Sequence, residues 1–112
     1  MSAFFESEII KEELGVINKL QEEVYGKLIH FHMMTHDEQL DHISKLSELL
    51  DKQRVMYARL SLSDDPEAQE MKKRIVESAS MMGLPSSIDM TSLFDNMSQA
   101  VEMMRKQIDK DL

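Results

Sequence analysis

The residues best suited to chemistry in this sequence are four histidines that lie close together in the chain. They are His30, His32, His36 and His42. Imidazole nitrogens bind metals, and two histidines four residues apart, such as His32 and His36, share one face of a continuous helix. Asp37 and Asp41 would add carboxylate ligands. A metal- or ligand-binding helical bundle is therefore one interpretation of this cluster.

A turn predicted between His32 and His36 argues against that interpretation, because a break in the helix separates the two rings. The chain also lacks cysteine and the His-Glu-x-x-His sequence of zinc-dependent hydrolases. Solvated histidines in a surface turn are the interpretation we favour, with a pH-sensitive turn as a further option. We therefore expect no metal site and no cofactor.

Paired carboxylates are the second possible source of chemistry. Glu12-Glu13 and Glu22-Glu23 fall on the polar faces of a predicted helix, whereas general acid–base catalysis needs a cleft that shifts a pKa. Glycine-rich phosphate loops and nucleophile motifs are absent from the sequence. We therefore expect a protein that is not an enzyme.

Charge and hydropathy exclude two further classes of function. The 112 residues include 21 acidic and 13 basic side chains, and the net charge is −8. Without a basic face to neutralise phosphates, direct binding to nucleic acid is disfavoured. Apolar runs stay well short of the ~20 residues of a membrane span, and the first residues do not resemble a signal peptide. We expect a cytoplasmic protein that binds neither nucleic acid nor membrane.

Helical periodicity predicts an all-α fold that begins with a long antiparallel helical hairpin over residues 1–62. The first helix is expected from about Ala3 to about Met33, and the second from the turn at residues 35–38 to about Leu60. Apolar residues recur in both helices at alternating three- and four-residue spacing. The predicted core positions are Ile10, Leu14, Ile17, Val24, Leu28, Phe31, Ile43, Leu46, Leu50, Tyr57 and Leu60. Gln21 and Gln53 interrupt the two apolar stripes and are expected to lie near each other.

Two further helices are expected in residues 63–112. Gly83 and Pro85 are expected to end the third helix, and the fourth is expected to begin near Asp89 or Thr91. Together with the hairpin they would form a single domain over residues 1–112. The expected core positions of these helices are Ala68, Met71, Ile75, Ala79, Met82, Met90, Phe94, Met97, Val101, Met104 and Ile108.

Two sets of residues mark the expected helix starts. Thr35 and Glu38 have the spacing of a capping box at the start of the second helix. Asp65 followed by Pro66 predicts the start of the third helix, because aspartate caps a helix and proline fits its first position.

The length of the predicted hairpin suggests self-association. A first helix of this length would span roughly 45 Å at ~1.5 Å per residue. A compact chain of this size has a radius of gyration of only ~13 Å. We therefore expect an elongated bundle that is completed by formation of a homodimer.

Methionine and phenylalanine supply the candidate contact residues. The chain has 11 methionines, and such side chains form adaptable binding surfaces. Met97 and Met104 follow the apolar stripe of the fourth helix, and Met103 points about 100° away from Met104. We predict that these three methionines contact a partner. Phe4-Phe5 either closes over the hairpin end or a dimer mate, which we favour, or inserts into a partner's pocket.

Four segments and Met90 carry a family resemblance. The segments are Ala-Phe-Phe-Glu-Ser-Glu-Ile at residues 3–9, Tyr-Gly-Lys at 25–27, Arg-Val-Met-Tyr-Ala-Arg-Leu-Ser-Leu-Ser-Asp-Asp at 54–65, and Leu-Phe-Asp-Asn-Met at 93–97. The whole chain resembles a small uncharacterised all-helical family found in cyanobacteria and their phages. The chain departs from the family at the histidine-rich turn and at residues 86–88. The resemblance implies a cyanobacterial setting, host-encoded or phage-encoded, and no defined activity.

Taken together, the sequence predicts an interaction protein, a regulator or adaptor that binds a larger protein complex of unknown identity. The alternative is the metal- or ligand-binding bundle built on the turn histidines. A structural subunit of a phage particle also stays open, because helical hairpins occur there too.

Overall fold

The fold is all-α, as predicted, in a computed structural model that describes residues 3–81 and 90–110. Within these residues the elements in chain order are α1 (Ala3–Glu6), α2 (Glu8–Leu28), the 3₁₀ turn η1 (Phe31–Met33), α3 (His36–Leu62), α4 (Pro66–Met81) and α5 (Met90–Lys110). The expected start of the fourth helix agrees with Met90. The expected stop at Gly83 and Pro85, and Met82 as a core residue, lie outside the described residues, as does the side chain of Ala79.

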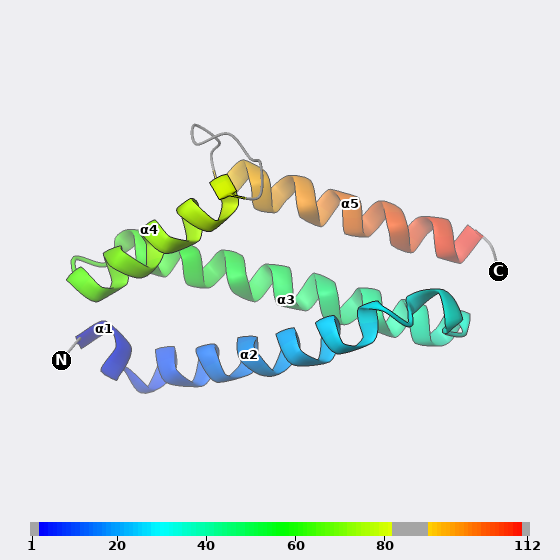
Figure 1. The fold of residues 1–112 in the computed structure, drawn as a ribbon, viewed down its shortest axis with the longest axis horizontal. Helices are drawn as coiled ribbons and strands as arrows, with labels where there is room; N and C mark the ends of the chain where they lie inside the picture. Colours follow the sequence, from blue (N-terminus) through cyan, green and yellow to red (C-terminus); the bar gives the residue numbers. More distant parts are fainter. Residues whose placement is uncertain (1–2, 82–89, 111–112) are drawn as a thin grey trace.

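Helix α3 is the centre of the molecule (Figure 1). Helices α2 and α5 run along different sides of α3, both in the opposite direction to it, and α4 packs on its C-terminal part. The short α1 contacts α2 and α4. The molecule measures 50 × 32 × 20 Å, and its radius of gyration is 15.9 Å. It is therefore more extended than a compact chain of this length, for which ~13 Å is typical.

Both helix starts predicted from capping residues are confirmed. The Thr35 hydroxyl accepts a hydrogen bond from the Glu38 amide at 3.2 Å, which caps α3. Asp65 Oδ1 accepts from the Glu67 amide at 2.9 Å, which caps α4. Each bond satisfies an amide that the first turn of a helix leaves without an intrahelical partner.

The first helix differs from the prediction at both ends. The chain is extended at Ser7, with φ −62° and ψ 130°, so that α1 is separate from α2. The Phe4 amide donates to Asp65 Oδ2 at 3.0 Å, which holds α1 toward the start of α4. At the other end α2 stops at Leu28 rather than near Met33. Tertiary contact at one end and the turn at the other thus shorten the continuous helix.

The hydrophobic core forms three clusters along α3. The first joins α2 to one side of α3 and to α4 through Ile10, Ile17, Leu20, Val24, Leu49, Met56, Leu60 and Ala68. The second joins α3 to α5 through Ile43, Leu50, Val101 and Ile108, and the third contains Met90 and Phe94. Among the predicted core positions, Leu28 is exposed. Leu20, Leu49 and Met56 are buried without having been predicted.

The described helices include none that is long and apolar enough to cross a membrane.

Candidate functional site

Helix α5 exposes methionines that were expected to be core. Phe94, Val101 and Ile108 are buried, and Val101 and Ile108 pack against α3. In contrast, Met97 and Met104 are 37% and 41% exposed. The expectation that these two methionines lie in the core is therefore wrong. The physical reason is that α3 covers only one side of α5 here, so that a single row of residues is buried.

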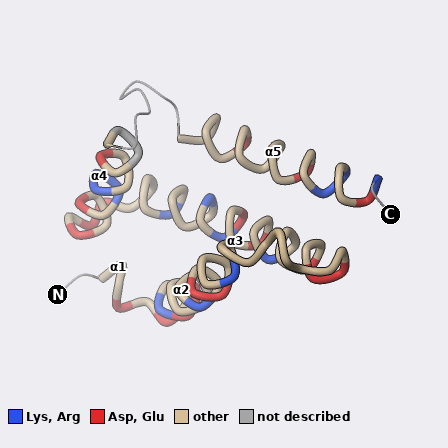
Figure 2. The backbone as a smooth tube through the Cα atoms, turned by 45° about the vertical axis from the view of Figure 1, so that its right-hand side comes forward, with Lys and Arg blue, Asp and Glu red and all other residues tan. Residues whose placement is uncertain are grey.

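The first part of α5 is poor in charge. Residues 90–101 contain one charged side chain, Asp95, although 30% of the whole chain is charged. Figure 2 shows the contrast between this stretch of α5 and α2, where acidic and basic residues follow one another closely. Depletion of charge together with enrichment of methionine is typical of the central part of protein–protein interfaces.

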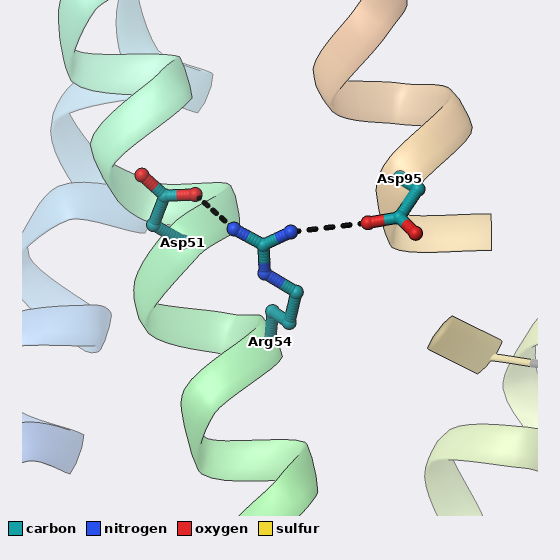
Figure 3. A network of polar contacts seen from close by, with 3 residues as sticks. All are labelled: Asp51, Arg54 and Asp95. Atoms are coloured by element: carbon teal, nitrogen blue, oxygen red, sulfur yellow. Dashed lines mark hydrogen bonds and ion pairs between the residues drawn. The ribbon is translucent and has the colours of Figure 1, made fainter. Parts of the chain in front are cut away.

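Asp95 is itself paired across two helices (Figure 3). Arg54 of α3 donates from one terminal nitrogen to Asp95 Oδ1 at 3.1 Å and from the other to Asp51 Oδ1 at 2.8 Å. The three side chains are partly exposed, so each ion pair is expected to contribute at most about 1 kcal/mol to stability. The network nevertheless places a cation beside the one charge in this part of α5.

Met103 lies on a different flank of α5 and is 70% exposed. It lines a shallow hollow of 520 Å³ together with Lys106, Gln107 and Lys110. An exposed apolar side chain is thus placed beside two lysines in a chain whose net charge is −8. This hollow is suited to an acidic segment that also carries an apolar side chain.

Phe4 and Phe5 are accounted for by contacts within the chain. Their rings meet edge to face with centroids 5.0 Å apart. Both side chains are partly buried against the first core cluster, and Phe5 also borders a hollow with Met71. These contacts agree with the favoured interpretation, in which the pair closes over one end of the molecule. Their role as a partner contact stays a prediction.

The four histidines do not converge on a common point. His30, His32 and His36 are exposed, and His32 lies in η1 whereas His36 opens α3. His42 is buried, with 3% of its surface exposed. The described part of the chain contains no group of three His, Cys, Asp or Glu side chains that could hold a metal ion. The chain leaves helical geometry between His32 and His36, as the sequence had predicted.

The paired carboxylates flank the α2–α3 contact. Glu13 forms an ion pair with Arg59 at 3.1 Å, and Glu23 forms one with Lys45 at 3.4 Å. Lys45 also contacts Asp41 at 3.5 Å, and the two carboxylates, Asp41 more than Glu23, raise the pKa of the Lys45 ammonium. Glu13 and Glu23 therefore join α2 to α3, while Glu12 and Glu22 face solvent.

Gln21 and Gln53 lie together, as expected from their spacing. Both line a cleft of 330 Å³ whose other walls are mainly apolar and come from α2, α3, α4 and α5. The cleft is bordered by Met71 and Ile75 of α4 and by Phe94 of α5. The amides thus interrupt an apolar surface that is only partly covered.

Comparison with known families agrees with the resemblance seen in the sequence. A family model described as a domain of unknown function (DUF1825) matches residues 2–108. The chain belongs to this family. No curated protein and no solved structure shows significant similarity to the chain. Membership in DUF1825 brings no activity with it, so the function must be inferred from the surfaces described above.

Proposed function

We propose that this DUF1825 protein is a non-enzymatic interaction module, a regulator or adaptor that forms a homodimer and binds a larger protein complex. The observation that carries the proposal is the set of exposed methionines on α5. Met97 lies in the first twelve residues of the helix, which carry one charge, and Met103 and Met104 lie just beyond them. Exposed apolar side chains gain free energy when a partner buries them.

The contact between two copies is placed along the row that contains Met97 and Met104. A second copy carries the same net charge of −8, so a contact between copies is favoured where charged residues are few. Residues 90–101, which include Met97, suit such a contact, since Asp95 is already paired with Arg54. Met104 continues the row two helical turns beyond Met97, where charged residues are more frequent. In this proposal α2 and α3 form the hairpin expected from the sequence. The contact between the two copies lies on α5 and not on that hairpin.

The second partner is placed at the hollow that contains Met103. Lys106 and Lys110 favour an acidic segment of the partner, and Met103 favours an apolar side chain within that segment. The family resemblance suggests that this partner belongs to a complex of the cyanobacterial cytoplasm, and to the host if the chain is phage-encoded. The identity of the complex is left open by the proposal.

Sedimentation equilibrium tests the dimer. The wild-type chain is expected to be dimeric at about 50 μM, and the double variant Met97→Gln/Met104→Gln is expected to be a folded monomer at the same concentration. Met33→Gln is the matched control, because Met33 is exposed outside α5 and its replacement should leave the dimer intact. A monomeric wild-type chain, or a double variant as dimeric as the control, would contradict the proposal.

Comparative capture tests the second partner. Wild-type and Met103→Ser chains are used as baits in the same cyanobacterial lysate, with Met33→Ser as the control bait. The proposal expects a protein that both the wild-type and the control baits retain and that the Met103→Ser bait loses. Equal retention by all three baits would show that the Met103 hollow is not the docking surface.

A further inference from the structure

His42 lies near the start of α3, and its side chain packs against η1 in the turn before that helix. Its side chain is 3% exposed, and its ring lies 5.5 Å from the ring of Phe31 in η1. Neither Nδ1 nor Nε2 has a hydrogen-bond partner among the described residues, and both atoms are shielded from solvent. A buried imidazole normally has a partner for at least one nitrogen, so this arrangement requires a physical explanation.

The position is suited to a neutral ring and unsuited to a charged one. A neutral imidazole carries one N–H, whereas the protonated ring carries two N–H donors and a positive charge that here would lack an acceptor. Burial lowers the pKa of His42 below its ordinary value of 6.5, and the positive charge of Lys27 lowers it further. Asp41 raises the same pKa, and Lys45 lowers it again.

Two of the three charged groups that act on His42 where it packs are lysines, Lys27 and Lys45, and the third is Asp41. Lys27 approaches from α2, and Lys45 is held on α3 between Asp41 and Glu23. Beside His42 lies an open hollow of 660 Å³. Its other titratable lining residues are Lys27, His30, Asp37, Glu38 and Asp41. The other histidine of η1, His32, has its ring centroid 6.2 Å from that of Phe31. A protonated His42 would therefore be better solvated in the hollow than where it now packs.

We propose that His42 makes the connection between α2 and α3 a proton-sensitive latch, closed while the imidazole is neutral and opened when it gains a proton. Phe31 connects the latch to the rest of the molecule. Its ring packs on His42 and also on the α3–α5 cluster of Ile43, Leu50, Val101 and Ile108, and its carbonyl accepts from Gln39 Nε2 at 2.9 Å. Opening the latch removes Phe31 from this cluster and loosens the end of α5.

The direction of the pH effect follows from the lowered pKa. Well above pH 6.5 the ring is neutral in the closed and open states alike, and the latch does not respond to pH. Below that value the open state binds a proton that the closed state resists, so the open fraction rises as pH falls. The rise is at most about tenfold per pH unit, and it ends below the pKa of the closed state.

Proton titration of the full-length chain by NMR is the first test. The ring C–H signals of His42 are expected to titrate with a midpoint below 6.5, the ordinary value for histidine. A midpoint at or above 6.5 would overturn the proposal, and this measurement needs no variant that might fail to fold.

Amide hydrogen exchange is the second test and reports on opening. The Met33 and Met34 amides, which donate to His30 and Phe31 carbonyls at 2.9 and 3.2 Å, should lose protection between about pH 7.5 and about pH 5.5, after correction for intrinsic exchange. His42→Leu should abolish this loss, and the matched control His36→Gln, at an exposed site, should keep it. The proposal is overturned if His42→Leu loses protection as the wild type does.

Discussion

The carboxylate of Asp65 connects the first helix of the chain to the fourth, because its Oδ2 accepts a hydrogen bond from the Phe4 amide at 3.0 Å. Its other oxygen caps α4 through the Glu67 amide at 2.9 Å. One side chain therefore satisfies the first turns of two helices. Closure of the Phe4-Phe5 pair over the core depends on a residue more than fifty positions away.

Replacing Asp65 should destabilise the chain more than replacing its neighbour. Asp65→Ala removes a helix cap, which costs about 0.5–2 kcal/mol, together with the acceptor for Phe4, which costs about 1 kcal/mol more. Asp65→Ser should keep the helix cap and lose only the contribution of the hydrogen bond from the Phe4 amide. Asp64→Ala is the control, because Asp64 is exposed. Urea unfolding measures the series, and equal losses for the two alanine variants would contradict the dual role.

Glycines on the outer face of α2 should be replaceable with a gain in stability. A Cβ added at Gly15 or Gly26 would meet no atom within 4 Å outside the local helix backbone. Alanine at either position should raise the free energy of unfolding by about 0.5–1 kcal/mol, because glycine loses more backbone freedom on folding. Thermal unfolding by circular dichroism measures the gain. A loss of stability, or a changed sedimentation coefficient, would indicate that another chain covers this face.

Replacing the two glutamines of the four-helix cleft with leucine should stabilise the folded protein. Gln21 and Gln53 line a mainly apolar cleft, so the double variant Gln21→Leu/Gln53→Leu should raise the thermal midpoint. It should also broaden the distribution of oligomeric states, since the polar pair no longer penalises other registers. A lower midpoint would mean that the amides make hydrogen bonds in solution that outweigh the burial of leucine.

The Arg54–Asp95 pair should contribute a small and salt-sensitive stabilisation. A double-mutant cycle with Arg54→Met and Asp95→Asn is expected to give a coupling free energy of about 0.2–1 kcal/mol, because both side chains are partly exposed. The coupling should fall toward zero at roughly 1 M salt. A coupling above about 2 kcal/mol, unchanged by salt, would show that the pair is buried in the assembled protein.

Much of the fold was readable from the sequence because its signals are local. Caps at Thr35 and Asp65 set the starts of α3 and α4, and alternating apolar spacing marked the helical segments. The features of the fold that the sequence did not predict depend on contacts between helices. The chain is extended at Ser7, and the Phe4 amide bonds to Asp65, which lies 61 positions away in the sequence and therefore could not be found from local patterns.

The breadth of the core on α3 was also missed for a physical reason. A helix that packs against a neighbour on one side buries a single row of side chains. Helix α3 instead contacts α2 on one flank and α5 on another. A second row, His42, Leu49 and Met56, is therefore buried beside the predicted row that contains Ile43 and Leu50. Seven-residue spacing in two adjacent rows could have indicated this. The opposite error occurred on α5, where its neighbours leave Met97 and Met104 of the apolar stripe exposed.

The central claim is that partners bury the exposed methionines of α5, which are Met97, Met103 and Met104. The effect of truncating a methionine should follow its exposure in the structure. Met103→Ser should change the free energy of unfolding by less than about 0.5 kcal/mol, whereas Met56→Ser, at a buried site, should cost about 2–5 kcal/mol. Met97→Ser and Met104→Ser should fall between these limits.

Methyl NMR of methionine-labelled protein across a dilution series tests the claim most directly. As the concentration rises, the methyl groups of Met97 and Met104 should become protected from a soluble paramagnetic probe, and Met33 should stay accessible. Addition of the captured partner should then protect Met103. Persistent accessibility of Met97 and Met104 at concentrations where the chain sediments as a dimer would contradict the claim and place the interface elsewhere.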